Sequence, residues 1–164
     1  MPQDAEVEHT ALNQYKVFTF FKASLTDEHL EDIFRKYDPR KIKILQISDS
    51  KITPQLLSQL PIVLNELPLN SVTDLQGNDL AIDLFFKNFV FQNLEVLSLQ
   101  NQNLGNAELA MIAQWSGLKS LNLSHHQITA EGLSEIAKLQ EREDLDLSSN
   151  QIGRLSNAAL PLPR

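Results

Sequence analysis

Apolar residues recur along this chain in a pattern that repeats from one segment to the next. The segments LEVLSLQNQNL, LKSLNLSHHQI and REDLDLSSNQI begin at Leu94, Leu118 and Arg142, which lie 24 residues apart each time. Within each copy, apolar and polar residues alternate, and this alternation predicts a strand with one buried face. A fixed period of this length predicts a solenoid of stacked units.

Three further copies extend the pattern toward the N-terminus. They begin at Tyr15, Ile42 and Asn70, so the six starts are separated by 27, 28, 24, 24 and 24 residues. Each strand is followed by apolar residues three or four apart, which is the spacing of one face of a short helix. These pairs are Leu30 and Ile33, Leu57 and Leu60, Phe85 and Phe89, Leu109 and Ile112, and Leu133 and Ile136.

Threonines precede three of these apolar pairs, at Thr26, Thr53 and Thr129. A hydroxyl at this place can accept a hydrogen bond from a free N–H group at the start of a helix. After Thr26 the chain carries acidic residues first and basic residues last, an order that suits the helix dipole. We therefore expect a helix that begins after Thr26 and ends before Pro39.

The unit L-x-x-L-x-L-x-x-N-x-L resembles that of the leucine-rich-repeat family over roughly residues 15–160, most closely its ribonuclease-inhibitor-like and bacterial branches. The resemblance implies an α/β solenoid with a parallel concave sheet of about six strands and short helices on the convex side. In that family the asparagine satisfies backbone groups between repeats. Here the position holds Asn78 and Asn150, and elsewhere Ala23, Ser50, Gln102 and His126.

The pattern divides the chain into three regions. Residues 1–11 are predicted to be a disordered tail, residues 12–41 an N-terminal capping repeat, and residues 42–164 leucine-rich repeats ending in a truncated unit. The two prolines in the segment LPIVLNELPL, residues 60–69, favour an irregular outer segment. Pro161 and Pro163 forbid a full helix in the last unit, so its strand is predicted to leave an edge, open in a monomer or capped by a partner.

Composition and charge narrow the environment and the partner. The 164 residues are 42% hydrophobic, which is enough for one domain with a continuous core. The chain has no cysteine, no apolar run of membrane-spanning length and no signal peptide, so we expect a cytoplasmic protein that does not bind membranes. A net charge of −7 argues against nucleic acid and favours a protein partner with a basic surface.

Candidate chemistry is sparse. His125 and His126 are adjacent, and neighbouring residues of an extended chain point to opposite sides, so they do not predict a metal site. His126 is predicted to replace the structural asparagine, and His125 to point outward near the rim of the concave face. Asp144 and Asp146 share a strand face, but no third group completes a catalytic or metal constellation. We therefore predict no enzyme activity, no metal and no cofactor, with a hydrolase at the acidic end as the weakest alternative.

The predicted partner-binding site is the concave face, made of the side chains that flank the buried leucines of each strand. This face is more apolar toward the N-terminus and polar to acidic toward the C-terminus. The predicted contact residues are Ile44, Gln46, Ser48, Val72, Asp74, Gln76, Val96, Ser98, Gln100, Ser120, Asn122, Ser124, His125, Asp144, Asp146 and Ser148.

Resemblance to the family implies a non-enzymatic module that grips a partner protein. The partner could be an enzyme whose active site the module covers, as an inhibitor or as a regulator of an effector. The alternative is the substrate-recognition fragment of a larger enzyme or of a bacterial effector, which would be delivered into a host cell.

Overall fold

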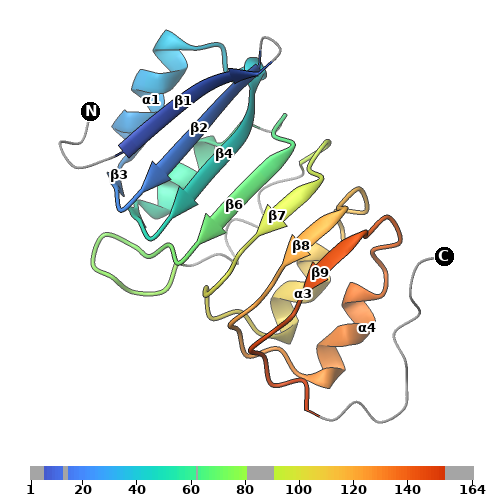
Figure 1. Cartoon of the computed structure of the whole chain (residues 1–164). Coiled ribbons are helices and arrows are strands. Elements are labelled where there is room, and N and C mark those ends of the chain that lie inside the picture. The colour runs from blue at the N-terminus through green and yellow to red at the C-terminus, as the bar shows by residue number, and fades with distance from the viewer. Residues whose placement is uncertain (1–5, 13–14, 62, 81–90, 154–164) are drawn as a thin grey trace.

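A seven-stranded sheet organises the chain (Figure 1). The computed structural model describes residues 6–12, 15–61, 63–80 and 91–153. Six strands are parallel and follow one another in chain order, and an antiparallel strand precedes them at one edge. The strands are β1 (Glu6–Leu12), β2 (Tyr15–Phe21), β4 (Ile42–Ser48), β6 (Glu66–Asn70), β7 (Val96–Ser98), β8 (Ser120–Asn122) and β9 (Asp144–Asp146).

The helices lie on one side of this sheet and leave its other side open (Figure 1). A two-stranded parallel sheet, β3 (Ser24–Leu25) with β5 (Lys51–Ile52), joins the first two units beyond the corner. The helices of the described ranges are α1 (Asp27–Lys36), α3 (Asn106–Ile112) and α4 (Leu133–Ile136), and the 3₁₀ turns there are η1 (Pro39–Lys41), η2 (Pro54–Gln59) and η3 (Ala130–Gly132). The predicted α/β solenoid with six parallel strands is confirmed.

The N-terminal segment corrects one prediction. Residues Glu6–Leu12 form β1, which pairs antiparallel with β2 from Glu6 opposite Phe21 to Leu12 opposite Tyr15. The expectation of disorder up to residue 11 is therefore wrong for residues 6–11, while residues 1–5 lie outside the described part. The segment EVEHTAL shows only a weak alternation of apolar and polar residues. Because most of its residues are polar, the sequence pattern did not predict a strand there. The strand covers the edge that β2 would otherwise expose.

The core is a continuous stack of the apolar residues that the repeat pattern predicts. Each inner rung contributes two side chains that are at most 3% exposed, from Phe18 and Phe20 through Leu121 and Leu123. Burial of each leucine removes apolar surface from water and contributes roughly 1.5–3 kcal/mol. The helical layer closes the core from behind, with Leu30, Leu109 and Ile136 all buried. Packing between neighbouring rungs is therefore what holds the solenoid together.

The third unit begins six residues earlier than its predicted start. Its strand is β6, with Leu67 and Leu69 in the core and Leu67 paired with Leu97 of β7. The unit therefore starts at Leu64, inside the segment that its prolines had marked as irregular. Pro68 does lie in a strand, and the paired residues of β4 and β6 skip its position, because proline has no N–H to donate.

A left-handed corner at the same position of every unit confirms this corrected register. In units starting at residues 15, 42, 64, 94, 118 and 142, the eighth residue has a positive φ between 48° and 61°. None of these residues is glycine, although this region of conformational space favours glycine. They are Lys22, Asp49, Ser71, Asn101, His125 and Ser149.

The three threonines stand at the predicted starts, but the hydroxyls of Thr53 and Thr129 do not accept the predicted hydrogen bond from a helix N–H group. Thr26 is the N-cap of α1, and the Nδ1 atom of His29 accepts a hydrogen bond from the Thr26 N–H at 2.9 Å. Thr53 and Thr129 stand at the same place before η2 and η3, so the outer segment of the second unit is a 3₁₀ turn where we expected a helix. The predicted pair Phe85 and Phe89 lies outside the described residues.

The residues at the asparagine position join each unit to the preceding one. Asn150 accepts a hydrogen bond from Ile128 N–H at 3.0 Å and donates to Leu123 C=O at 2.7 Å. His126 takes over the first of these bonds, because its Nδ1 atom accepts from Leu104 N–H at 3.1 Å. Gln102 takes over the second, donating to Leu69 C=O at 2.9 Å.

The remaining residues at this position follow from their place in the stack. Ser50 accepts a hydrogen bond from the Ala23 N–H at 3.1 Å, so it also joins its unit to the preceding one. Ala23 belongs to the first unit, which has no preceding repeat to join, so an apolar side chain suffices there. In the corrected register the third unit carries Val72 at this position, and Asn78 lies in the following turn, where it bonds Asp74.

Candidate functional site

The side of the sheet opposite the helices is the predicted concave face, which we call the open face (Figure 1). It presents the third, fifth and seventh residue of each unit. These residues form three rows: Val17, Ile44, Glu66, Val96, Ser120 and Asp144; Thr19, Gln46, Pro68, Ser98, Asn122 and Asp146; Phe21, Ser48, Asn70, Gln100, Ser124 and Ser148.

Three predicted contact residues do not lie on this face. Val72 is 2% exposed and packs in the core, while Asp74 and Gln76 lie in the turn that follows β6. Asp74 holds that turn together, because its carboxylate accepts hydrogen bonds from the N–H groups of Gln76 and Asn78 at 2.9 and 2.8 Å. The hydrogen bond from the Asn78 side chain, above all, lowers the pKa of Asp74 below its ordinary value.

The residues that take their places are Glu66, Pro68 and Asn70, which the register error had hidden. The signal that could have found them is the spacing of Leu64, Leu67 and Leu69, which repeats the spacing of the leucines in the fourth and fifth units. The other predicted residues lie on β4, β7, β8 and β9 or directly after them, as expected, but Ser124 is only 2% exposed, so its side chain offers a partner almost no surface. Whether a partner contacts them is a separate prediction.

The open face changes character along the stack. Its N-terminal flank carries Val17 and Ile44 beside Phe21, which is 39% exposed. Its C-terminal end carries Asp144 and Asp146 on β9. Glu66 adds a carboxylate near the middle, so the gradient is less smooth than predicted. A partner with an apolar patch at one end and cations at the other would complement this face.

Internal hydrogen bonds fix many of the polar side chains on the open face. Ser98 donates to the Asn70 side chain at 2.6 Å, and Ser124 donates to the Asn122 side chain at 2.8 Å. The Ser148 N–H donates to Asp146 at 2.9 Å, and its backbone and side-chain hydrogen bonds lower the pKa of Asp146 below its ordinary value of 3.8. Binding to such a face loses less side-chain entropy than binding to free side chains.

An ion pair joins two neighbouring rungs at the beginning of their strands. Lys119 of the fifth unit contacts Glu95 of the fourth, with 3.0 Å between the Lys119 Nζ and Glu95 Oε2 atoms. This hydrogen bond is the main cause that raises the pKa of Lys119, and Glu143 and Glu141 add to it. The pair shows that side chains at the same position of adjacent rungs are close enough to exchange charge-assisted hydrogen bonds.

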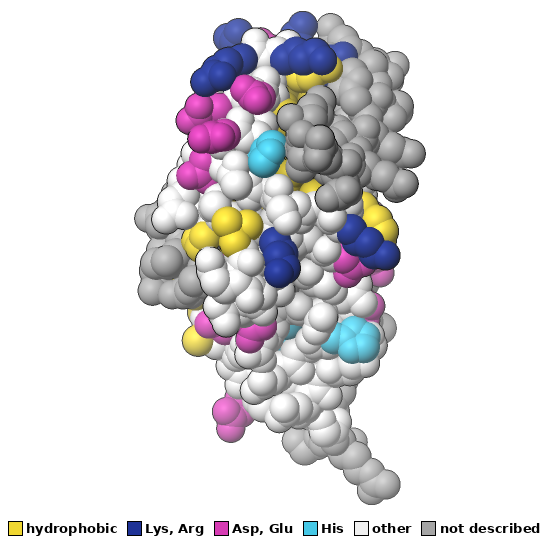
Figure 2. Space-filling view, turned by 90° about the vertical axis from the view of Figure 1, so that its left-hand side faces the viewer, with side chains coloured by type: hydrophobic (Ala, Val, Ile, Leu, Met, Phe, Trp, Pro, Cys, Tyr) yellow, Lys and Arg dark blue, Asp and Glu magenta, His cyan; other side chains and the backbone are white. Residues whose placement is uncertain are grey.

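The corners after the strands form a shallow groove of about 690 Å³ along one side of the solenoid. Polar side chains from successive units line it, and Asn103 links two of them by donating to Asp79 and accepting from Gln127. Figure 2 looks at this side, where uncharged surface covers most of the lower half. His125 is exposed there, as predicted, and His126 is buried.

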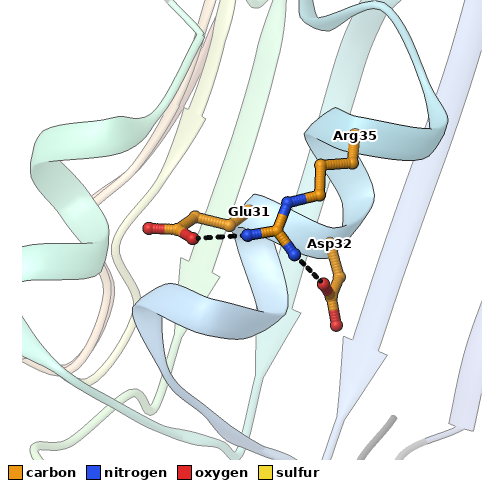
Figure 3. A network of polar contacts seen from close by, with 3 residues as sticks. All are labelled: Glu31, Asp32 and Arg35. Atoms are coloured by element: carbon orange, nitrogen blue, oxygen red, sulfur yellow. Dashed lines mark hydrogen bonds and ion pairs between the residues drawn. The ribbon is translucent and has the colours of Figure 1, made fainter.

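The helix side of the molecule carries exposed ion pairs. On α1, Arg35 contacts both Glu31 and Asp32, at 3.2 and 3.0 Å (Figure 3). All three side chains are more than half exposed, so these pairs contribute only tenths of a kcal/mol, roughly 0.2–1 each. Their charges compensate one another in part, which makes this surface a weaker candidate for recognition than the open face.

Neither a metal-binding cluster nor a helix able to span a membrane occurs among the described residues. In these ranges no group of three or more His, Cys, Asp or Glu side chains converges on a point that could hold a metal ion. No helix among the same residues has the length and apolar character to cross a membrane.

A comparison with protein families agrees with the repeat pattern of the fifth unit. A family model described as a leucine-rich repeat matches residues 118–137, which include β8 and α4. Among solved structures, an internalin from Listeria monocytogenes is similar to this chain, with 19% sequence identity and a TM-score of 0.45. The match covers 71% of this chain and 38% of the internalin, so the chain spans well under half of that protein. No curated protein sequence matches the chain.

Proposed function

We propose that this chain, which carries a repeat matched by a leucine-rich-repeat family model, is a non-enzymatic binding module whose open face grips a partner protein. The observation that carries the proposal is the uncovered open face, whose side chains are already fixed by hydrogen bonds. Solenoids offer extended surfaces of this kind to partners.

The size of the open face indicates how a partner would have to contact it. Six strands at about 4.8 Å spacing make a strip on the order of 25 Å long, and five residues of strand span about 17 Å. The resulting area of roughly 400 Å² is about half of the 800 Å² that each partner usually contributes to a stable interface. The partner therefore also contacts the corners, where His125 and Ser149 adjoin the open face.

The charge of the open face supports a partner with a basic surface. Asp144 and Asp146 form no ion pair with any described residue, and a complementary cation would speed association and fix orientation. One such partner is an enzyme whose active site the module covers, as an inhibitor or as a regulator of an effector. The absence of cysteine from the sequence supports a cytoplasmic site of action, in the producing cell or in a host cell.

The alternative is that the repeats select substrates for a larger enzyme or for a bacterial effector. Both versions use the same open face, so one binding experiment tests what they share. The presence of a catalytic domain on the same natural polypeptide would favour the substrate-selecting version over the stand-alone module.

The experiment compares two double variants. Gln46→Arg with Val96→Arg places two long cations on the open face at residues that are only partly buried. Gln55→Arg with Ala110→Arg places the same charges on exposed residues of η2 and α3, on the helix side. A partner retained by the wild type should bind the helix-side variant within about twofold and the open-face variant at least tenfold more weakly.

The opposite outcome would move the site. If the helix-side variant loses the partner and the open-face variant keeps it, the open face is not the binding surface. Circular dichroism of both variants serves as the control for folding.

A further inference from the structure

The last rung of the sheet lacks the hydrogen bonds that every inner rung makes with its successor. In the fifth unit, the Lys119 C=O accepts from Glu143 N–H and Asp144 N–H at 2.7 and 2.9 Å. Leu123 N–H donates to Asp146 C=O at 2.8 Å, and His125 N–H to Ser148 C=O at 3.0 Å. The equivalent groups of the sixth unit are Glu143 C=O, Leu147 N–H and Ser149 N–H, and no described residue bonds them.

The side chains of the last rung show the same incompleteness. Leu121 and Leu123 are 1% and 0% exposed, whereas Leu145 and Leu147, their equivalents, are only partly buried. A further rung would cover the apolar area that these two side chains leave in water, and this burial would stabilise the pairing. Considering residues up to 153 alone, the edge of β9 thus presents unpaired backbone groups and partly exposed leucines to an incoming strand.

Charge selects the kind of strand that fits. The carboxylates on and beside β9 are Glu143 and Asp144, which are exposed, and Asp146, which is partly buried, and none of them is paired with a cation among the described residues. The Lys119–Glu95 pair, at 3.0 Å, shows that a basic side chain on one rung reaches an acidic one at the same position of the next. An added strand with basic residues at these positions would repeat that geometry.

The same charges disfavour pairing between two copies of this edge. Two β9 strands placed side by side would bring Asp144 and Asp146 of one copy against those of the other. Like charges directly opposite each other destabilise a strand pair. A second copy is therefore a poorer occupant of this edge than a basic segment.

We propose that the outer edge of β9 accepts a basic, extended segment of another protein as a seventh parallel strand. The segment carries Lys or Arg at every second residue, facing Asp144 and Asp146, and apolar residues between them that cover Leu145 and Leu147. Backbone hydrogen bonds supply affinity, and the alternating side chains supply specificity. This proposal is independent of partner binding at the open face.

The probe is a synthetic peptide that copies residues 117–128 of the chain itself, with Ser120→Lys and Asn122→Lys. Its own Lys119 then faces Glu143, and the two new lysines face Asp144 and Asp146. The matched control carries glutamate at the same two positions. We expect the full chain to bind the lysine peptide at least tenfold more tightly than the glutamate peptide, measured by fluorescence anisotropy at moderate salt.

Backbone methylation separates strand addition from mere attraction of charges. In the chain, Asp144 N–H donates to the preceding rung at 2.9 Å, so the peptide N–H at the Ser120 position should donate to Glu143 C=O. N-methylation there should weaken binding at least tenfold. N-methylation at the Leu121 position, whose N–H points away from β9 in a parallel pair, should change affinity less than threefold. Equal effects of the two methyl groups would overturn the proposal.

Protein variants complete the test. Asp144→Lys with Asp146→Lys should invert the preference, so that the glutamate peptide binds more tightly. Gln46→Arg alone, on β4 and four strands away from β9, should leave peptide binding unchanged, which separates this result from that of the open-face experiment. Failure of the full chain to bind either peptide overturns the proposal. Binding that then emerges on deletion of residues 154–164 would assign the edge to that segment, and dimers in sedimentation would assign it to a second copy.

Discussion

His126 joins two repeats through a single ring nitrogen. Its Nδ1 atom accepts from Leu104 N–H, and its Nε2 atom is buried without a hydrogen-bond partner among the described residues. Only a neutral imidazole with an unprotonated Nδ1 atom can accept this bond. Burial is the main cause that lowers the pKa of His126 below its ordinary value of 6.5, with the charge of His125 adding to it and the Leu99 carbonyl opposing it.

This arrangement predicts that stability falls in mild acid. Above pH 6.5 His126 is neutral in both the folded and the unfolded chain. Below pH 6.5 the unfolded chain takes up a proton that the folded chain resists, so the free energy of unfolding decreases until the pH passes the lowered pKa of the folded state. The slope cannot exceed about 1.4 kcal/mol per pH unit for one proton. Urea unfolding at a series of pH values measures it.

His126→Asn is the matched variant for this prediction. Asparagine can accept from Leu104 N–H and donate to Leu99 C=O, as Asn150 does with Ile128 and Leu123 one rung later. We expect the variant to be at least as stable as the wild type at pH 7.5 and to lose the part of the pH dependence that sets in below pH 6.5. An unchanged pH profile would show that another group titrates there.

At the scale of the element, the inner and outer rungs should differ in what a leucine contributes. Leu121→Ala removes a side chain that is 1% exposed and should cost about 2–5 kcal/mol in the free energy of unfolding. Leu145→Ala, at the equivalent place on β9, should cost less than half as much, because Leu145 is only partly buried. Chemical denaturation compares the two, and equal losses would mean that something covers β9 in solution.

The sequence predicted most elements because the leucine spacing reports the buried face directly. It failed at β6, where Pro61 and Pro68 outweighed the spacing of Leu64, Leu67 and Leu69. Proline is rare inside sheets because it cannot donate a hydrogen bond. In this strand, the burial of two leucines outweighs the loss of one hydrogen bond. The same error misplaced Val72, Asp74 and Gln76 in the candidate site. The spacing of the apolar residues shows which face of each strand is buried. Only the strand pairing shows which residues of the third unit lie opposite Val96 and Ser98.

At the scale of the molecule, each rung contacts mainly its immediate neighbours, so the ends govern local opening. The N-terminal end is covered by β1, whereas no described strand covers β9. We expect amide hydrogens of β9 and the following corner to exchange fastest among the rungs, and the lysine peptide to slow them. Hydrogen exchange with mass spectrometry measures this, and uniform protection across all rungs in a dilute monomer would contradict an uncovered end.

Substitutions at the six left-handed corners can measure how cooperatively the rungs of the chain unfold. A non-glycine residue in this conformation stores roughly 1 kcal/mol or more of backbone strain, which glycine at the same place relieves. Lys22→Gly and Ser149→Gly would therefore add similar increments of stability at opposite ends of the stack. If the rungs unfold as one body, either change shifts the whole melting curve, and if they unfold in blocks, each shifts only the transition of its own end.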